Sequence, residues 1–389
     1  MREAIKLAVP PRGFFVPGVT HLYCRPVNLI YSPQLDQDTR EPSYCRLAGG
    51  SLIFEKIELI LRDQQHIYYF ESSIDAARAW ALAEGCIEEL DRLMLMIVSR
   101  RAGHFEEKDT SPLLMGIINV SPESFFGGAT SFNTEAAISR AHSLIAEGVD
   151  IIDVGGESTK PGSRPIKTSE EIDRVAAVIE GIKGFGVPIS IDTSKPKVME
   201  AALSAGASII NDITALTGDP NSLSLAAQYK VPVVLMHMKG TPLTMQKRPQ
   251  YDSAILDVFD YLKWRVSVCL QAGILPENLI IDPGIGFGKN DDHNISILMR
   301  ISLLHSLGFP ILLGMSRKSL IASLSDGEPV DKRLPGSLAA AIYAAGQGVQ
   351  LLRVHDVSET RQALAVKEAL QCSFESKLRW GIDINQLGW

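Results

Sequence analysis

The sequence lacks the features that mark several large classes of protein. Its five cysteines are scattered, and no two form a Cys-x-x-Cys pair. This spacing argues against a disulfide framework or a zinc site and favours reduced thiols in a cytoplasmic protein. No apolar run approaches the roughly 20 residues that span a bilayer, so we expect no membrane segment. Pro10 and Pro11 interrupt the short basic N-terminus, and we expect no signal peptide.

The chain also lacks an excess of positive charge. Its 389 residues include 38 basic and 45 acidic side chains, for a formal net charge of −7. Without a basic field, nucleic acid is not an expected partner. Apolar residues make up 46% of the sequence, which suits a large core. The length fits one large α/β domain with additional material.

Eight short apolar runs, rich in Ile, Val and Leu, alternate with amphipathic stretches from Leu113 onward. The runs cover residues 113–120, 150–156, 188–193, 208–214, 231–238, 279–284, 310–316 and 349–356. Strands that are buried on both faces read as continuous apolar runs, and strand–helix alternation favours a parallel sheet. The pattern predicts an α/β protein with a (β/α)8 TIM barrel. An open, doubly wound sheet is the alternative.

The residues before the barrel have a different character. They contain turn-rich pieces, candidate strands at 51–61 and 66–72, and one long helix candidate at 74–103. We therefore predict a small α+β N-terminal region of unknown role at 1–108. The barrel is predicted at 109–372 and a C-terminal tail at 373–389.

Polar side chains follow the apolar runs where each predicted strand ends. They are Asn119, Glu157, Ser158, Thr159, Asp192, Asn211, Asp212, His237, Asp282, Ser316, Arg317, Lys318, Arg353, His355 and Asp356. Polarity resumes at any strand end, but in a barrel these ends meet at one face, where active sites form. Carboxylates, an amide and fixed cations suit a planar heterocycle with donor and acceptor edges, and an arginine can stack on its face. Asn119 and His355 could take an anion, such as a phosphate leaving group.

The stretch from Asp282 to Lys289 is rich in glycine and resembles a phosphate-binding loop at first sight. A P-loop lysine is followed by Ser or Thr, whereas Asn290 follows Lys289 here, and the GxGxG spacing is one residue short of a dinucleotide fingerprint. The glycines more plausibly let the backbone pass close beneath Asp282 and a flat ligand, with Phe287 as an apolar wall.

The ordered motifs resemble those of the dihydropteroate synthase family. They are MGIINVSPESF, DVGGESTKPGS, SIDTSKP, NDI, VVLMHMKG, IIDPGIGFGK, GMSRKS and RVHDV, between Leu113 and about Leu370. The resemblance implies a TIM barrel that joins para-aminobenzoate to 6-hydroxymethyl-7,8-dihydropterin pyrophosphate in folate synthesis, with Mg2+ as cofactor. It further implies a dissociative mechanism, in which pyrophosphate leaves before the arylamine attacks a pterin-methylene cation.

The resemblance also assigns roles by motif position. It implies a pterin site of Asp192, Asn211, Asp282, Lys318 and Arg353, in which Asp192, Lys318 and Asp282 are the catalytic side chains. It implies a pyrophosphate site of Asn119, Arg353, His355 and Thr159, with Asn119 as the metal ligand. The implied aminobenzoate site consists of Phe125, Thr159, Pro161, Phe287 and Ser316. A homodimer through barrel helices is a further expectation from the family.

Two loops depart from the family pattern. The first reads SFFGGAT, without the aspartate that usually follows SF, and the second has Lys160 in place of arginine. Lysine keeps the charge but loses the bidentate fork. We therefore expect retained pterin binding with altered turnover or arylamine selectivity. The alternatives are a pterin-dependent methyltransferase and a non-catalytic pterin-binding paralogue.

Overall fold

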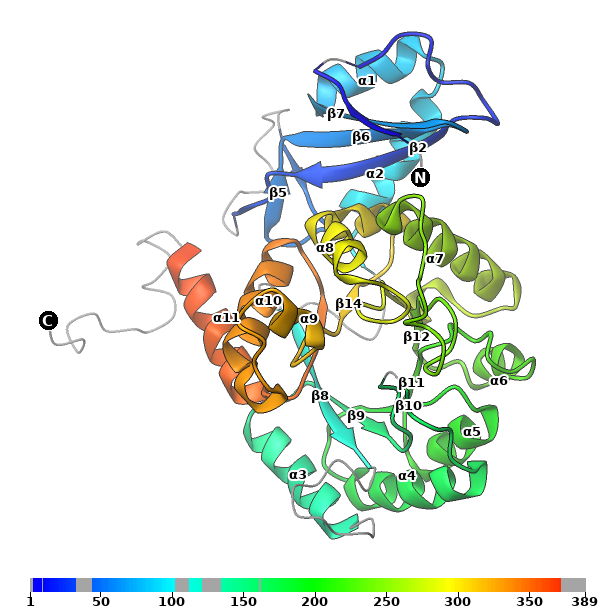
Figure 1. Ribbon diagram of the computed structural model, residues 1–389, viewed down its shortest axis with the longest axis vertical. Helices are drawn as coiled ribbons and strands as arrows, with labels where there is room; N and C mark the ends of the chain where they lie inside the picture. Colours follow the sequence, from blue (N-terminus) through cyan, green and yellow to red (C-terminus); the bar gives the residue numbers. More distant parts are fainter. Residues whose placement is uncertain are drawn as a thin grey trace, which may run out of the picture.

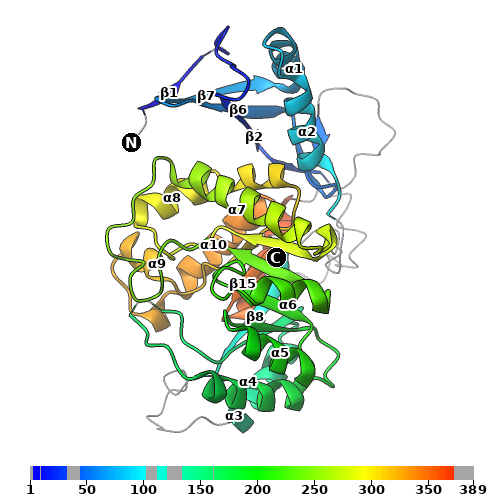
Figure 2. The same cartoon turned by 90° about the vertical axis from the view of Figure 1, so that its right-hand side faces the viewer.

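The computed structural model describes residues 3–8, 10–32, 44–101, 112–120, 134–160 and 162–371. Figure 1 and Figure 2 show an N-terminal module, residues 3–101, placed on one side of a barrel. The predicted boundaries at residues 108 and 372 stay predictions, because 102–111 and 372–389 lie outside the described residues.

The barrel is one parallel sheet of eight strands in the order β13-β12-β11-β10-β9-β8-β15-β14. A parallel bridge between Ile281 and Ile311 joins its two end strands. Each predicted apolar run contains one strand, so the predicted (β/α)8 barrel is confirmed. The strands are β8 (Leu113–Asn119), β9 (Ile151–Gly155), β10 (Ile189–Asp192), β11 (Ile209–Asp212), β12 (Val233–Met236), β13 (Leu279–Asp282), β14 (Leu312–Leu313) and β15 (Leu351–Val354).

Helices cover the outside of this sheet (Figure 1). They are α3 (Thr134–Ala146), α4 (Thr168–Ile182), α5 (Pro196–Ala205), α6 (Ser222–Tyr229), α7 (Ala254–Gln271), α8 (Asp291–Met299), α9 (Ser319–Ser323), α10 (Leu334–Gly346) and α11 (Val357–Gln371), with 3-10 turns η1 (Pro276–Asn278), η2 (Ile301–Leu307) and η3 (Val330–Lys332). Successive residues of most barrel strands belong to two different apolar clusters. A small buried cluster that includes Met115, Ile209 and Val234 is separate from the large cluster that packs against the helices. This inner cluster is the layered filling typical of a barrel.

The N-terminal module contains two sheets and two helices. Its larger sheet has the order β1 (Glu3–Lys6), β7 (His66–Ser73), β6 (Lys56–Arg62) and β2 (His21–Val27), and its smaller sheet has β3 (Ile30–Tyr31), β5 (Leu52–Phe54) and β4 (Cys45–Arg46). The prediction of one long helix at 74–103 was wrong. Gly85 adopts a positive φ of 73° and separates α1 (Ile74–Ala83) from α2 (Ile87–Val98), because glycine readily takes this helix-ending conformation.

The module packs on the outer helices of the barrel through polar and apolar contacts. The Tyr23 hydroxyl donates to both oxygens of Asp260 on α7, at 3.1 and 3.0 Å, and Arg62 lies 2.8 Å from Asp257. Arg101 donates to the carbonyl of His305 on η2 at 3.0 Å. In both views α4 and α5 lie at the far side of the barrel from the module (Figure 1, Figure 2).

Candidate active site

Strands β9, β10, β11 and β15 bring two carboxylates, an amide and a guanidinium together at the mouth of the barrel. Arg353 on β15 contacts Asp153 on β9 at 2.6 Å through Nε and Asp192 on β10 at 2.7 Å through Nη2. The Asn211 amide donates to both oxygens of Asp153 at 3.3 Å. Asp192 and Asn211 are direct partners in the parallel register of β10 and β11. The predicted pterin residues Asp192, Asn211 and Arg353 therefore do lie together.

Asp153 is the member of this cluster that sequence reasoning missed. It is fully buried and pairs with both Arg353 and Asn211. Its signal in the sequence was an acidic residue inside the apolar run DIIDVGG. A buried carboxylate requires partners, so a charge within a buried strand was a reason to expect a cation or donor opposite it.

One oxygen of Asp192 has no hydrogen-bond partner among the residues that the structure describes. Its side chain is 8% exposed, Oδ2 pairs with Arg353, and Oδ1 is buried without any hydrogen bond to the described residues. Burial raises the pKa of Asp192 to about 7, Arg353 opposes this rise, and Asp153 adds to it. A buried acceptor without a donor is unfavourable, and a ligand with N–H groups would satisfy it.

Asp282 and Lys318 lie close enough beside this cluster for each charge to affect the pKa of the other. The Asp282 carboxylate accepts from the Gly284 N–H at 2.7 Å, and the Lys318 ammonium donates to the carbonyl of Ile285. The ammonium also lies 4.8 Å from the centroid of the Phe287 ring. Burial lowers the pKa of Lys318 to about 8, opposed by the charge of Asp282. Asp282, Phe287 and Lys318 are thus neighbours, as their strand-end positions predicted.

The side chain of Lys289 binds backbone carbonyls of the glycine-rich loop. This side chain is 2% exposed, and its ammonium contacts the carbonyls of Gly284 and Phe287 at 2.8 and 3.0 Å and Nδ1 of His237 at 2.9 Å. A Cβ at Gly284 would lie 2.0 Å from the His237 carbonyl oxygen. The close approach that requires glycine is therefore to the chain after β12, and Lys289 is a structural anchor for the loop.

Ser316 and His355 lie at another side of the mouth. Nδ1 of His355 is 2.9 Å from the Ser316 hydroxyl oxygen, which also accepts from the His355 N–H at 3.1 Å. Burial lowers the pKa of His355 to about 4, and Arg353, Arg317 and Lys160 lower it further. His355 is thus a neutral side chain at neutral pH in a region of positive charge, which suits an anion.

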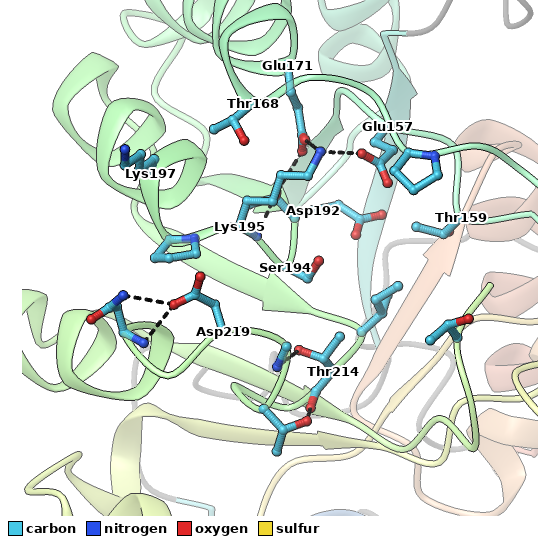
Figure 3. A pocket seen from close by; sticks show the side chains of 18 of the residues that line it. Glu157, Thr159, Thr168, Glu171, Asp192, Ser194, Lys195, Lys197, Thr214 and Asp219 are labelled. Atoms are coloured by element: carbon cyan, nitrogen blue, oxygen red, sulfur yellow. Dashed lines mark hydrogen bonds and ion pairs between the residues drawn. The ribbon is translucent and has the colours of Figure 1, made fainter. Parts of the chain in front are cut away.

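A cavity of about 1030 Å³ opens at the strand ends, and Figure 3 shows it from close by. Thr159 and Asp192 both line it. A Cβ at Gly155 would lie 3.5 Å from Oδ2 of Asp192 and 3.8 Å from Oδ1 of Asn119, so the bare backbone at Gly155 leaves space between these groups. Phe125 and Pro161, predicted for the aminobenzoate site, lie outside the described residues.

Comparison with known proteins identifies the family. Residues 115–355 match the family model described as pterin binding enzyme. The chain is 48% identical to the dihydropteroate synthase of Escherichia coli (strain K12) over 267 residues, which cover 68% of this chain and 94% of that protein. The chain belongs to the dihydropteroate synthase family.

Other relatives and solved structures support this assignment. The dihydropteroate synthase of Neisseria meningitidis serogroup B is 44% identical over 275 residues, 69% of this chain and 96% of that one. The Yersinia pestis enzyme with a sulfonamide drug superposes with a TM-score of 0.65 at 43% identity, covering 68% of this chain and 95% of that one. The Xanthomonas albilineans enzyme with 4-aminobenzoic acid gives 0.64 at 44% identity, covering 68% and 94%.

Family membership makes the chain a transferase of folate biosynthesis. The matched segment begins after the N-terminal module, which is additional to it. Every helix in the described ranges is too short or too polar to cross a membrane.

Proposed function

We propose that this chain condenses 6-hydroxymethyl-7,8-dihydropterin pyrophosphate with para-aminobenzoate, which yields 7,8-dihydropteroate and pyrophosphate. The observation that carries the proposal is the Asp192 carboxylate, which lines a large cavity. Arg353 pairs with its Oδ2, and its Oδ1 is buried without a hydrogen bond to the described residues. The 2-amino and ring N–H groups of a pterin are the donors that this oxygen needs.

The pterin would lie on five side chains that we call the pterin floor: Asp192, Asn211, Asp282, Lys318 and Arg353. Asp192 and Asp282 supply acceptors, Asn211 supplies an amide, and Lys318 supplies a donor above Phe287. Arg353 has its charge balanced by Asp153 and Asp192, so its planar guanidinium is held for stacking on the ring. The floor thereby matches a heterocycle with both donor and acceptor edges.

The chemical step that we propose uses the charge of Asp192 in the pterin floor. The bond between the pterin methylene carbon and the pyrophosphate oxygen breaks, and the leaving pyrophosphate takes the electron pair. The ionised Asp192 stabilises the positive charge that develops on the pterin, which is catalysis by a charge placed in advance. The aminobenzoate nitrogen then forms the new C–N bond and releases a proton.

The pyrophosphate would lie towards Asn119, Thr159, Arg353 and His355. Lys160 adds positive charge there, since it lowers the pKa of His355. The described residues include no cluster of three or more His, Cys, Asp or Glu side chains that could hold a metal by themselves. Mg2+ prefers oxygen ligands and retains several waters. Asn119 with pyrophosphate oxygens therefore fits this ion, which would neutralise charge on the leaving group when bound.

The aminobenzoate would lie between Thr159, Phe287 and Ser316. Phe287 offers a ring face beside the Lys318 ammonium, and Ser316 is held by His355. Lys160 in this loop cannot make the two parallel contacts of an arginine. We therefore infer an altered response to arylamine analogues, which a sulfonamide inhibition series measures. Inhibition equal to that of a relative with arginine at this position would contradict it.

A homodimer is the assembly we propose for this chain. Adjacent helices α10 and α11 expose large apolar side chains, with Tyr343 at 43%, Val366 at 54% and Leu370 at 79%, and a second copy would cover them. Light scattering should give twice the mass of the chain. Val366→Glu combined with Leu370→Glu should give the monomer, and a monomeric wild type would contradict the assembly.

Calorimetric titration with the pterin pyrophosphate tests whether the pterin floor binds this substrate. Asn211→Ala should weaken binding about tenfold, because one buried hydrogen bond is worth roughly 1.4 kcal/mol here. The matched control is Asn221→Ala, since Asn221 lines the outer cavity and bonds within its own turn. Equal affinities in wild type and Asn211→Ala would contradict the proposal that the pterin binds at this site.

A further inference from the structure

Lys195, just before α5, lies at the centre of an ion-pair network beside the active site. Its ammonium donates to Oε2 of Glu157 and, at 2.7 Å, to Oε2 of Glu171 (Figure 3). It also donates to the carbonyl of Ile166 at 2.9 Å. A lysine has three N–H donors, so all of them are committed. Lys195 therefore has no donor left for a substrate, and its role lies in what it holds.

Two of the three partners are the ends of one loop. This loop, residues 157–167, follows β9 and carries Thr159; we call it the β9 loop. Besides the shared contact with Lys195, the Ile166 N–H donates to Oε2 of Glu157 at 3.2 Å. The Ser158 and Ser163 hydroxyls are 2.9 Å apart inside the loop. Lys195 and Glu157 together close the loop at its base.

The third partner connects this base to Asp192. Glu171 on α4 is 1% exposed, and its other oxygen accepts from the hydroxyl of Thr193 at 2.7 Å. Thr193 directly follows Asp192 in the chain. A Cβ at Gly156 would lie 2.8 Å from Cγ of Glu171, so the start of the β9 loop packs closely on the same side chain. The network thus runs from the end of β10 to the β9 loop.

We propose that Lys195 is a positioning residue that fixes the β9 loop relative to Asp192 and so sets the affinity for the arylamine acceptor. The proposal rests on the proposed function, which places the acceptor against Thr159. The pterin floor is held by Arg353 and Asp153, which make no contact with Lys195. Loss of the lysine should therefore act on the acceptor and leave pterin binding nearly unchanged.

Four variants test this proposal. Glu157→Gln removes the charge that binds Lys195 at the start of the loop but leaves the Lys195–Glu171 pair intact, and Glu157 is 23% exposed, so folding should tolerate the change. Lys195→Met removes all three contacts of the ammonium, and Lys195→Arg keeps the charge. Lys197→Met is the matched control, because Lys197 lines the same cavity and is exposed.

The main readout is the Michaelis constant of each substrate in the coupling reaction. Glu157→Gln and Lys195→Met should raise KM for para-aminobenzoate about tenfold, with KM for the pterin pyrophosphate within about twofold of wild type. Lys195→Arg should recover most of the loss, and Lys197→Met should behave as wild type. A role in folding alone would leave both KM values unchanged in the folded fraction, and that result overturns the proposal.

Hydrogen exchange provides a readout that is independent of turnover. The peptide over residues 157–167 should exchange at least about fivefold faster in Glu157→Gln and in Lys195→Met than in wild type and in Lys197→Met. Equal exchange in wild type and all variants would overturn the proposal that Lys195 and Glu157 hold the β9 loop in place. If the wild type forms no dihydropteroate, the proposed function fails, while the exchange rates still decide whether Lys195 fixes this loop.

Discussion

Replacing Asp192 with asparagine should stabilise the substrate-free protein at alkaline pH while it impairs catalysis. Burial is the largest cause that raises the pKa of this carboxyl to about 7 from an ordinary 3.8; Arg353 opposes the rise, and Asp153, Glu171 and Asp212 add to it. The ionised form that the reaction uses is thus unfavourable in the empty site. Asparagine keeps the shape and removes the charge.

The size of the effect follows from proton linkage. The folded state binds the Asp192 proton more tightly than the unfolded chain does. The stabilisation from this group is therefore complete below the unfolded pKa and is lost as the pH rises through the folded pKa. Between pH 6.0 and pH 8.5, pKa values of 3.8 and about 7 give a loss on the order of 1 kcal/mol in the wild type. Asparagine does not titrate, so the variant does not lose it.

Urea denaturation at both pH values measures this difference. Tryptophan fluorescence and circular dichroism should give coincident transitions with the same slope for both proteins. The free energy of unfolding of Asp192→Asn, relative to wild type, should be larger at pH 8.5 than at pH 6.0 by an amount on the order of 1 kcal/mol. A difference between the proteins that is the same at both pH values would refute the raised pKa.

Three further predictions address other parts of the structure. Asp153→Asn should lower kcat/KM for the pterin substrate about tenfold, because Arg353 loses its contact with a fully buried carboxylate; steady-state kinetics at saturating aminobenzoate check this. Arg62→Met should lower the free energy of unfolding by about 1 kcal/mol without changing either KM, since its ion pair with Asp257 only joins the module to α7; unchanged stability would contradict that interface. Lys289→Met should lower the free energy of unfolding by roughly 3 kcal/mol, because buried acceptors of the glycine-rich loop lose their donor; a loss below about 1 kcal/mol in urea denaturation would contradict its anchoring role.

The convergence of the strand-end residues could be predicted from the sequence because parallel register is regular. Apolar runs mark the strands, and in a barrel their C-terminal ends meet at one face. Asp192 and Asn211 are register partners, and Arg353 reaches Asp192 from a strand 161 positions away. The convergence of these three residues therefore followed from the pattern without any knowledge of side-chain contacts, whereas their assignment to a pterin came from the family resemblance.

Other features depend on packing that the pattern does not encode. Lys289 appeared to belong to a ligand loop, but it is buried because the chain after β12 packs against that loop and offers the His237 nitrogen. Asp153 gains its role from Arg353, 200 positions away. The break between α1 and α2 depends on Gly85 adopting a positive φ, whereas glycine within a helical pattern is often tolerated.

Product formation by the wild type beside Asp192→Asn tests the central claim most directly. Purified protein is mixed with 6-hydroxymethyl-7,8-dihydropterin pyrophosphate, para-aminobenzoate and Mg2+, and dihydropteroate is followed by chromatography at pH 8.5. The account expects steady product from the wild type and a loss of at least about 100-fold in the variant, as for other pre-placed charges. Equal rates in the two proteins, or no product from the wild type, would contradict the account.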